Sequence, residues 1–308
     1  MPASMSSRIF MVVAALVPAA VFCQPPAVLN NTGEPMRVSY ACAEEGLQAA
    51  GLLCTEDEPC AIYLELNSIG TAGKKLFLAG DLHATSGTLA SIMLATDDGG
   101  ATWKEPTPRI RSAALEQVQF HDLEHGWAAG ETQYPLPRDP FFLVSTDGGQ
   151  SWRHRAVNEE GGPGSIQRFW FDSPQHGELL VDAGKTAVSG RYLLYESETG
   201  GESWMIRSTT GEMPKLKSAP AVLDNSDFRI TPSNDAIRIE RRLGEKWEPL
   251  ASFLIEVASC KLKAPQLKEP PPEADVSEKE LEPPKDYVDE LQIGGPANKP
   301  PAKKPAPK

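Results

Sequence analysis

The sequence lacks the short motifs that identify many enzymes. It contains no glycine-rich phosphate loop, no serine nucleophile elbow and no metal-binding triad. Its five cysteines include no CxxC pair, and no histidine lies among the cysteines near the N-terminus, which argues against a zinc site. We therefore expect no catalytic residue, no cofactor and no bound metal.

Basic residues are also in deficit. The formal net charge is −12. The last 48 residues hold nine lysines against nine acidic residues, so the negative excess belongs to the preceding part of the chain. Because an acidic domain is repelled by phosphate backbones, we expect no nucleic-acid partner.

No apolar run is long enough to span a bilayer comfortably. Arg8 precedes the longest run, which extends from Ile9 to Cys23 and is typical of a secretory signal. We predict a signal peptide over residues 1–23, cleaved after Ala20 or Cys23, and a periplasmic or secreted protein. Two alternatives are an uncleaved anchor and a lipoprotein acylated on Cys23. Among the mature forms that we expect, only the lipoprotein would be attached to the membrane. The bulky Phe22 argues against the lipoprotein.

Removal of the signal leaves an even number of cysteines, namely Cys42, Cys54, Cys60 and Cys260. An even number in an exported chain indicates two disulfides, for which three pairings exist. We predict that Cys60 pairs with Cys260 and Cys42 with Cys54, because CAIYLEL begins and SFLIEVASC ends the repeats described next.

The sequence contains three copies of an octet that combines acidic or hydroxyl residues, two glycines and a tryptophan. The copies read TDDGGATW, STDGGQSW and SETGGESW, and a degenerate fourth, ERRLGEKW, keeps only Gly244 and Trp247. Such residues form tight hairpin turns, in which a side-chain oxygen accepts hydrogen bonds from turn amides and glycine adopts positive φ. The predicted structural residues are Thr96, Asp98, Gly100, Thr102 and Trp103; Ser145, Asp147, Gly149, Ser151 and Trp152; and Ser197, Gly201, Ser203 and Trp204. The third copy has Thr199 in place of the aspartate.

Each octet is expected to form the turn between the third and fourth strands of a unit of four short strands. Trp103, Trp152, Trp204 and Trp247 are 49, 52 and 43 residues apart, close to the period of about 40–50 residues of a propeller blade. We predict an all-β fold, a β-propeller of four or five four-stranded blades over residues 60–260.

The octets resemble the Asp box, or bacterial neuraminidase repeat, of the sialidase-like superfamily. FHDLEHGWAAG followed by FFLVSTDGGQSW also resembles the photosystem II stability and assembly factor family of propellers, over about residues 61–250. This resemblance implies the fold and is compatible with a role in assembly. FRIT, at Phe228 to Thr231, echoes a sialidase arginine motif but follows the boxes instead of preceding them, so we interpret it as part of a strand.

Two further segments flank the repeats. Residues 24–59 form a cysteine-containing entry segment, with a short helix expected around Ala43 to Leu53. Residues 261–308, rich in proline, lysine and glutamate, are predicted to be a disordered tail. Within that tail, Tyr287 to Ile293 is either a docking motif or a chance apolar cluster.

We interpret Asp98 and Asp147 as structural, because each carboxylate serves its own turn. The histidines at positions 83, 121, 125, 154 and 176 lack metal spacing and are interpreted as surface residues.

Loops between the second and third strands of each unit should lie on the edge opposite the Asp boxes. They are Asp81 to Ala90, Glu131 to Pro140 and Lys185 to Gly190. The second offers the candidate partner-binding residues Tyr134, Arg138 and Asp139.

Two functions of different class fit this sequence. The first is a non-enzymatic scaffold that binds or assembles proteins of the cell envelope. The second is a sialidase-like protein that binds glycans or hydrolyses glycosides. The missing set of acid, base and nucleophile favours the first.

Overall fold

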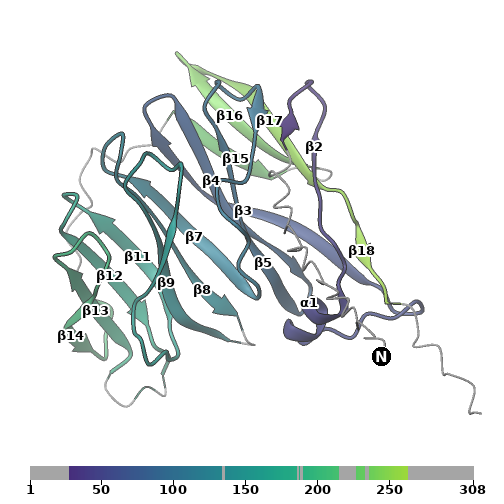
Figure 1. Cartoon of the computed structure of the whole chain (residues 1–308). Coiled ribbons are helices and arrows are strands. Elements are labelled where there is room, and N and C mark those ends of the chain that lie inside the picture. The colour runs from purple at the N-terminus through teal and green to yellow at the C-terminus, as the bar shows by residue number, and fades with distance from the viewer. Residues whose placement is uncertain are drawn as a thin grey trace, which may run out of the picture. The chain divides into compact units, whose positions relative to one another are not determined.

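A computed structural model describes residues 28–133, 136–185, 187, 190–214, 227–232 and 236–262. Almost all regular structure within these residues is β-strand (Figure 1). The short helix expected near Ala43 is present as α1 (Glu44–Ala49). No helix in the described part of the chain has the length and apolar character needed to cross a membrane.

Blade 1 is built from three long antiparallel strands. They are β3 (Cys60–Ala72), β4 (Lys75–Ala84) and β5 (Gly87–Thr96), and β18 (Ser259–Cys260) pairs with the outer side of β3. At the end of the first octet, for which we keep the name Asp box, β6 (Thr102–Trp103) pairs with β1 (Leu29–Asn30). Most of β4 is buried, since both faces of the sheet pack on other elements and its side chains are apolar in succession.

Blades 2 and 3 are four-stranded antiparallel meanders. Blade 2 contains β7 (Ala113–Phe120), β8 (Gly126–Gln133), β9 (Pro137–Ser145) and β10 (Arg153–Ala156). Blade 3 contains β11 (Ser165–Phe171), β12 (Gly177–Asp182), β13 (Tyr192–Ser197) and β14 (Met205–Thr210). In both blades the strands pair in chain order, as short turns require.

Blade 4 joins the two ends of the described chain. Its β15 (Phe228–Pro232), β16 (Ile237–Leu243) and β17 (Lys246–Ile255) are antiparallel, and β2 (Met36–Val38) adds parallel to β17, with Met36 opposite Phe253. FRIT lies in β15, as the strand interpretation predicts. The N-terminal segment therefore completes the last sheet.

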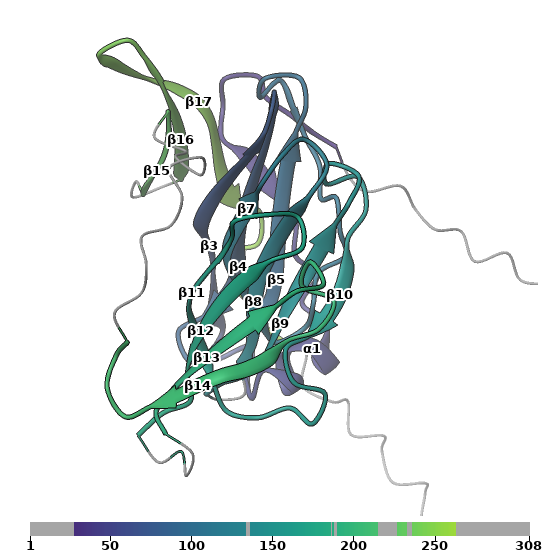
Figure 2. The same cartoon turned by 90° about the vertical axis from the view of Figure 1, so that its left-hand side faces the viewer.

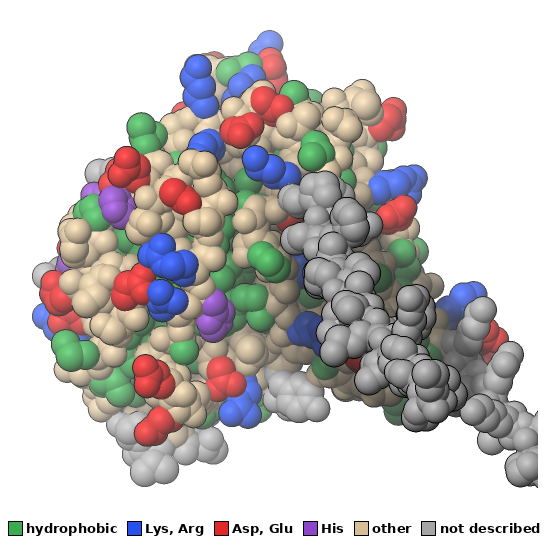
Figure 3. Space-filling view, in the orientation of Figure 1, with side chains coloured by type: hydrophobic (Ala, Val, Ile, Leu, Met, Phe, Trp, Pro, Cys, Tyr) green, Lys and Arg blue, Asp and Glu red, His purple; other side chains and the backbone are tan. Residues whose placement is uncertain are grey.

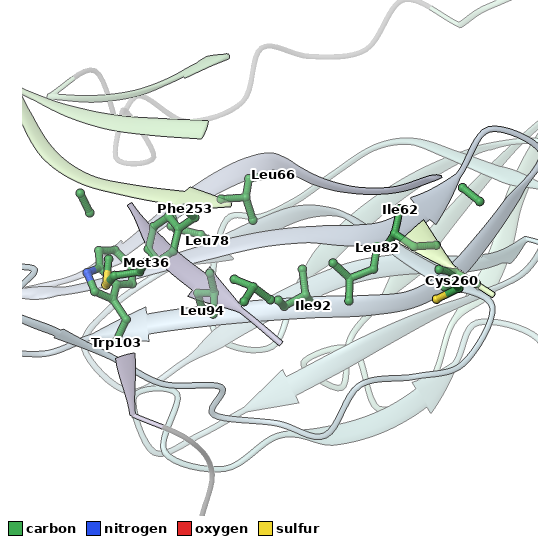
Figure 4. Packing of buried hydrophobic residues seen from close by; sticks show 14 of the residues in the cluster. Met36, Ile62, Leu66, Leu78, Leu82, Ile92, Leu94, Trp103, Phe253 and Cys260 are labelled. Carbon is green, nitrogen blue, oxygen red and sulfur yellow. The ribbon is translucent and has the colours of Figure 1, made fainter. Parts of the chain in front are cut away.

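The blades follow one another in the order 4, 1, 2, 3 (Figures 1 and 2). Apolar clusters fill the spaces between neighbouring sheets, and the largest lies between blades 1 and 4. Figure 4 shows Met36, Leu66 and Phe253 of this cluster pointing toward the same interior. No extensive contact between the described strands joins blade 3 to blade 4. Four-stranded sheets packed face to face confirm the predicted propeller class.

The predicted disulfide pairing is wrong. Cys42 bonds to Cys260, and Cys54 bonds to Cys60. Cys60 and Cys260 are direct register partners on β3 and β18, so the predicted proximity is correct. Their sulfurs nevertheless bond to the entry segment, which folds back beside this strand pair.

Two of the predicted variable loops are shorter than expected. Most of Asp81 to Ala90 belongs to β4 and β5, which connect through Thr85 and Ser86 alone. Much of Glu131 to Pro140 likewise belongs to β8 and β9. Continued strand pairing satisfies the backbone groups that a loop would leave exposed.

Several predictions fall outside the described residues. These are the signal peptide over residues 1–23, Tyr134, parts of the segment from Lys185 to Gly190, and the tail beyond Leu262 with Tyr287 to Ile293.

Candidate functional site

The Asp-box carboxylates are occupied by their own turns. The Asp147 carboxylate accepts hydrogen bonds from the amides of Gln150 and Ser151 and from the hydroxyls of Ser145 and Ser151. Asp98 is held in the same way by Thr96 and Thr102. In each box the first hydroxyl also accepts the amide of the second glycine, Gly100 or Gly149, whose φ is positive. These hydrogen bonds stabilise the turns and leave the two carboxylates with little capacity to bind a ligand.

The third box keeps this arrangement without an acid. The Thr199 hydroxyl accepts the Ser203 amide and lies 2.9 Å from the Ser203 hydroxyl. The Ser197 hydroxyl accepts the Gly201 amide, as its counterparts do in the first two boxes. One neutral oxygen thus replaces a carboxylate that would accept more and stronger hydrogen bonds.

The Asp-box turns pack beside the turns that join first and second strands. Lys75, after the first turn of blade 1, donates to the Gly148 carbonyl of the next blade at 2.8 Å. Within blade 2 the Gly148 amide donates to the Glu124 carbonyl. These contacts place both kinds of turn on one edge of the blades, where they stabilise one another.

We expect Asp147→Ala to lower the free energy of unfolding by about 2 kcal/mol, because it leaves two amides and two hydroxyls without their acceptor. Burial raises the pKa of Asp147, but the hydrogen bonds from Ser151, Ser145 and Gln150 outweigh it and lower the pKa to about 2. The stabilisation is therefore present above the unfolded-state pKa of about 4 and is lost as the pH falls toward 2. Urea unfolding followed by circular dichroism at pH 7 and at pH 2.5 measures both effects.

Asp97→Ala is the matched control, since Asp97 is an exposed residue of the first box that serves no turn amide and makes a 3.8 Å ion pair with Lys104. Its loss should stay within about 0.5 kcal/mol. Equal losses for the two variants at pH 7 would contradict the proposed role of the Asp147 carboxylate.

On the opposite edge, Asp139 fixes the hairpin that carries the predicted binding residues. Its φ is +49°, its carboxylate accepts the Gly162 amide at 2.7 Å, and its own amide donates to the Gly162 carbonyl. Arg138 donates to the Asp139 carboxylate at 2.9 Å, and about half of its side chain is exposed. Arg138 is therefore accessible, whereas Asp139 mainly holds the backbone.

A hollow of about 660 Å³ opens on this same edge. Its walls come from β3 and β4 of blade 1, β7 and β8 of blade 2, and the residues that follow α1. Four polar or charged residues stand out in the lining: Glu65, Asp81, His83 and Glu116. No lysine or arginine lines the hollow in the part of the chain that the structure describes.

Carboxylates dominate the electrostatics of the hollow. Asp81 Oδ1 lies 3.0 Å from His83 Nδ1, and this hydrogen bond is the largest contribution to a raised His83 pKa. Burial raises the pKa of Glu116 to about 7, and the nearby carboxylates of Glu131 and Asp81 add to the shift. The hollow is thus a region of negative potential.

Glu131 lies behind this wall and is structural. Its side chain is almost fully buried and accepts the Ile166 amide and the Ser165 hydroxyl of blade 3. Burial raises the Glu131 pKa against these hydrogen bonds. Glu131 therefore joins two blades and adds to the negative charge near Glu116.

Most of this hollow was not predicted from the sequence. Asp81 fell within a predicted loop, and His83 was interpreted as a lone surface histidine. Asp81 and His83 are two residues apart on a strand, which places them on one face and was the available signal. The contributions of Glu65 and Glu116 depend on strand register and blade packing, which a single sequence does not reveal.

Two other histidines lie next to acidic side chains. His176 lies 2.8 Å from Asp172 and 3.2 Å from Glu196, and His125 lies 2.9 Å from Asp122. On the face shown in Figure 3, acidic and basic side chains are interspersed. The hollow, with several carboxylates and no basic side chain except His83 in its described lining, is therefore a more distinctive candidate site than this mixed surface.

Similar proteins are found among solved structures. No family model and no curated protein matches the sequence. A structure titled "YCF48 bound to D1 peptide" is similar with 20% identity and a TM-score of 0.36, over 64% of this chain and 56% of that one. "YCF48 from Cyanidioschyzon merolae" is similar with 21% identity and a TM-score of 0.32, over 61% and 59%.

The chain thus aligns with less than two thirds of either YCF48 chain. The fold assignment rests on the four-stranded blades described above.

Proposed function

We propose that this chain is an exported, non-enzymatic propeller that binds a polypeptide partner and acts as an assembly scaffold in the cell envelope. Two disulfides support an oxidising compartment, because such bonds persist outside the cytosol. The binding surface is the edge that carries the hollow, with Arg138 on a neighbouring hairpin.

The proposal rests on the hollow, whose walls are formed by paired strands and short turns. Strands of two blades and the residues after α1 form its walls. A turn of only two residues, Thr85 and Ser86, connects β4 to β5. A partner segment laid across such an edge orders few groups of the scaffold, so little binding free energy is lost. Arginine is enriched among the residues that dominate protein interfaces, which makes Arg138 the candidate anchor.

We expect the double substitution Tyr134→Ala, Arg138→Ala to reduce partner capture from an envelope extract by more than about tenfold, the loss typical of interface hot spots. Quantitative mass spectrometry of co-purified polypeptides measures the capture. Gln150→Ala is the matched control, because Gln150 is exposed on the Asp-box edge. If Gln150→Ala abolishes capture and the double variant retains it, the partner binds the other edge.

A second candidate function is glycan binding or glycoside hydrolysis. It is favoured by the carboxylates around one hollow, since glycosidases use a pair of carboxylates on either side of the scissile bond. A panel of fluorogenic glycosides with the purified protein tests it. Turnover that disappears in Glu116→Gln would replace the scaffold proposal with this one.

A further inference from the structure

Three potential metal ligands lie on one face of blade 1. Asp81 and His83 are two residues apart on β4, and Glu65 of β3 is the direct register partner of Asp81. His83 Nδ1 lies 3.0 Å from Asp81 Oδ1 and 3.8 Å from Glu65 Oε2. One donor atom from each of the three side chains falls within 4.8 Å of the other two.

This arrangement carries uncompensated negative charge. Acidic residues directly opposite each other destabilise a sheet, and the Asp81 side chain is only 8% exposed. Glu116 lines the same hollow and has no hydrogen-bond or ion-pair partner among the described residues. The described lining contains no lysine or arginine, so His83 is the lining residue that can carry positive charge. A bound cation would supply the missing countercharge.

The distances suit a small transition-metal ion. Ligand atoms about 2.0–2.1 Å from a tetrahedral zinc ion lie about 3.3–3.4 Å from one another. The observed separations of 3.0 and 3.8 Å, measured from His83 Nδ1 to the Asp81 and Glu65 carboxylates, bracket this value. The His83 ring is stacked on Tyr63 with centroids 5.6 Å apart, which limits its orientation.

The ligand types narrow the choice of ion. Imidazole suits zinc and its neighbours, whereas magnesium and calcium prefer sites made entirely of oxygen. Three protein ligands also leave a fourth position open toward the hollow, as in zinc sites that hold water or a substrate.

We propose that Glu65, Asp81 and His83 form a binding site for a first-row divalent metal ion of the zinc type at the wall of the hollow. The site would neutralise this wall and present one exchangeable position to whatever enters the hollow. It does not depend on the proposed scaffold function, because the ion binds the free chain.

Titration of the untagged, chelator-treated full chain with Zn²⁺ by isothermal calorimetry tests the site. We expect one zinc ion per chain, and at least tenfold weaker binding of Ca²⁺ and Mg²⁺. His83→Asn and Glu65→Gln should each weaken zinc binding by at least tenfold. Glu65→Gln guards against a folding artefact, since the Glu65 side chain is 57% exposed. Binding of Co²⁺ in place of Zn²⁺ should give visible absorption bands that the two variants lose.

His176→Asn is the matched control, because His176 has comparable exposure and also lies near two glutamates, Glu196 and Glu198. It should leave zinc affinity unchanged. Absence of stoichiometric binding, unchanged affinity in both hollow variants, or a loss confined to His176→Asn would each overturn the site.

Discussion

Replacing Cys42 and Cys260 together by serine is expected to lower the free energy of unfolding by about 5 kcal/mol. The disulfide links residues 218 positions apart, so it closes nearly the whole described chain. In the chain-entropy model the unfolded state loses more freedom the longer the closed loop. Removing this bond should therefore be among the most destabilising changes available to the protein.

The folded structure adds to this expectation. Cys260 is fully buried and sits on β18, the two-residue strand that pairs with the start of β3. The entry segment that carries Cys42 leads into α1, whose Leu47 is also fully buried. Without the bond, both the entry segment and the last strand can separate from blade 1.

The double serine variant of Cys54 and Cys60 provides the comparison. This pair spans only six positions, for which the same model gives about 2 kcal/mol. Guanidinium unfolding of the oxidised proteins, followed by circular dichroism, yields both losses. If the short-range pair costs as much as the long-range pair, loop closure is not the source of the stabilisation.

The blades could be predicted from the sequence because their turns are specified locally. Asp147, Gly149 and Ser151 lie within five positions, and the hydrogen bonds that they make inside the octet span at most four positions. Trp152 then marks the start of the next strand. Such short-range chemistry repeats in the sequence wherever it repeats in the structure.

The disulfides and the last blade depend on contacts between distant segments. Met36 pairs with Phe253 across more than two hundred residues, and no pattern in the sequence specifies that β2 completes blade 4. For the same reason Cys42 and Cys260 could not be matched from spacing. The predicted seam between Cys60 and Cys260 located the correct region and assigned the wrong partners.

The candidate site shows the same division. Asp81 and His83 share a face because strands alternate, which the sequence reveals once the strand is recognised. Glu116 joins them only because β7 packs beside β3 and β4, an effect of blade packing. Binding surfaces on propellers combine residues from several blades, so sequence alone locates their scaffold better than their chemistry.

Trp127→Ala is expected to lower the free energy of unfolding by about 4 kcal/mol. Trp127 belongs to β8 of blade 2 and is 1% exposed. Its ring stacks on Phe171 of blade 3 with centroids 3.7 Å apart, and its Nε1 donates to the Gly200 carbonyl at 2.8 Å. The substitution removes a large buried contact and leaves that carbonyl without its donor.

The matched control is Trp247→Ala in blade 4. Trp247 is half-buried, and its main ring contact is a cation–π interaction with Arg229, whose guanidinium lies 4.4 Å from the ring centroid. Such a contact contributes about 1 kcal/mol near the surface, so this loss should be several times smaller. Urea unfolding followed by circular dichroism measures both. Because Trp127 joins blades 2 and 3, its loss should also produce cleavage within residues 165–210 that the unsubstituted protein does not show in limited proteolysis. Equal stability losses, or new cleavages confined to blade 4 of the Trp127→Ala variant, would show that this tryptophan does not hold the two blades together.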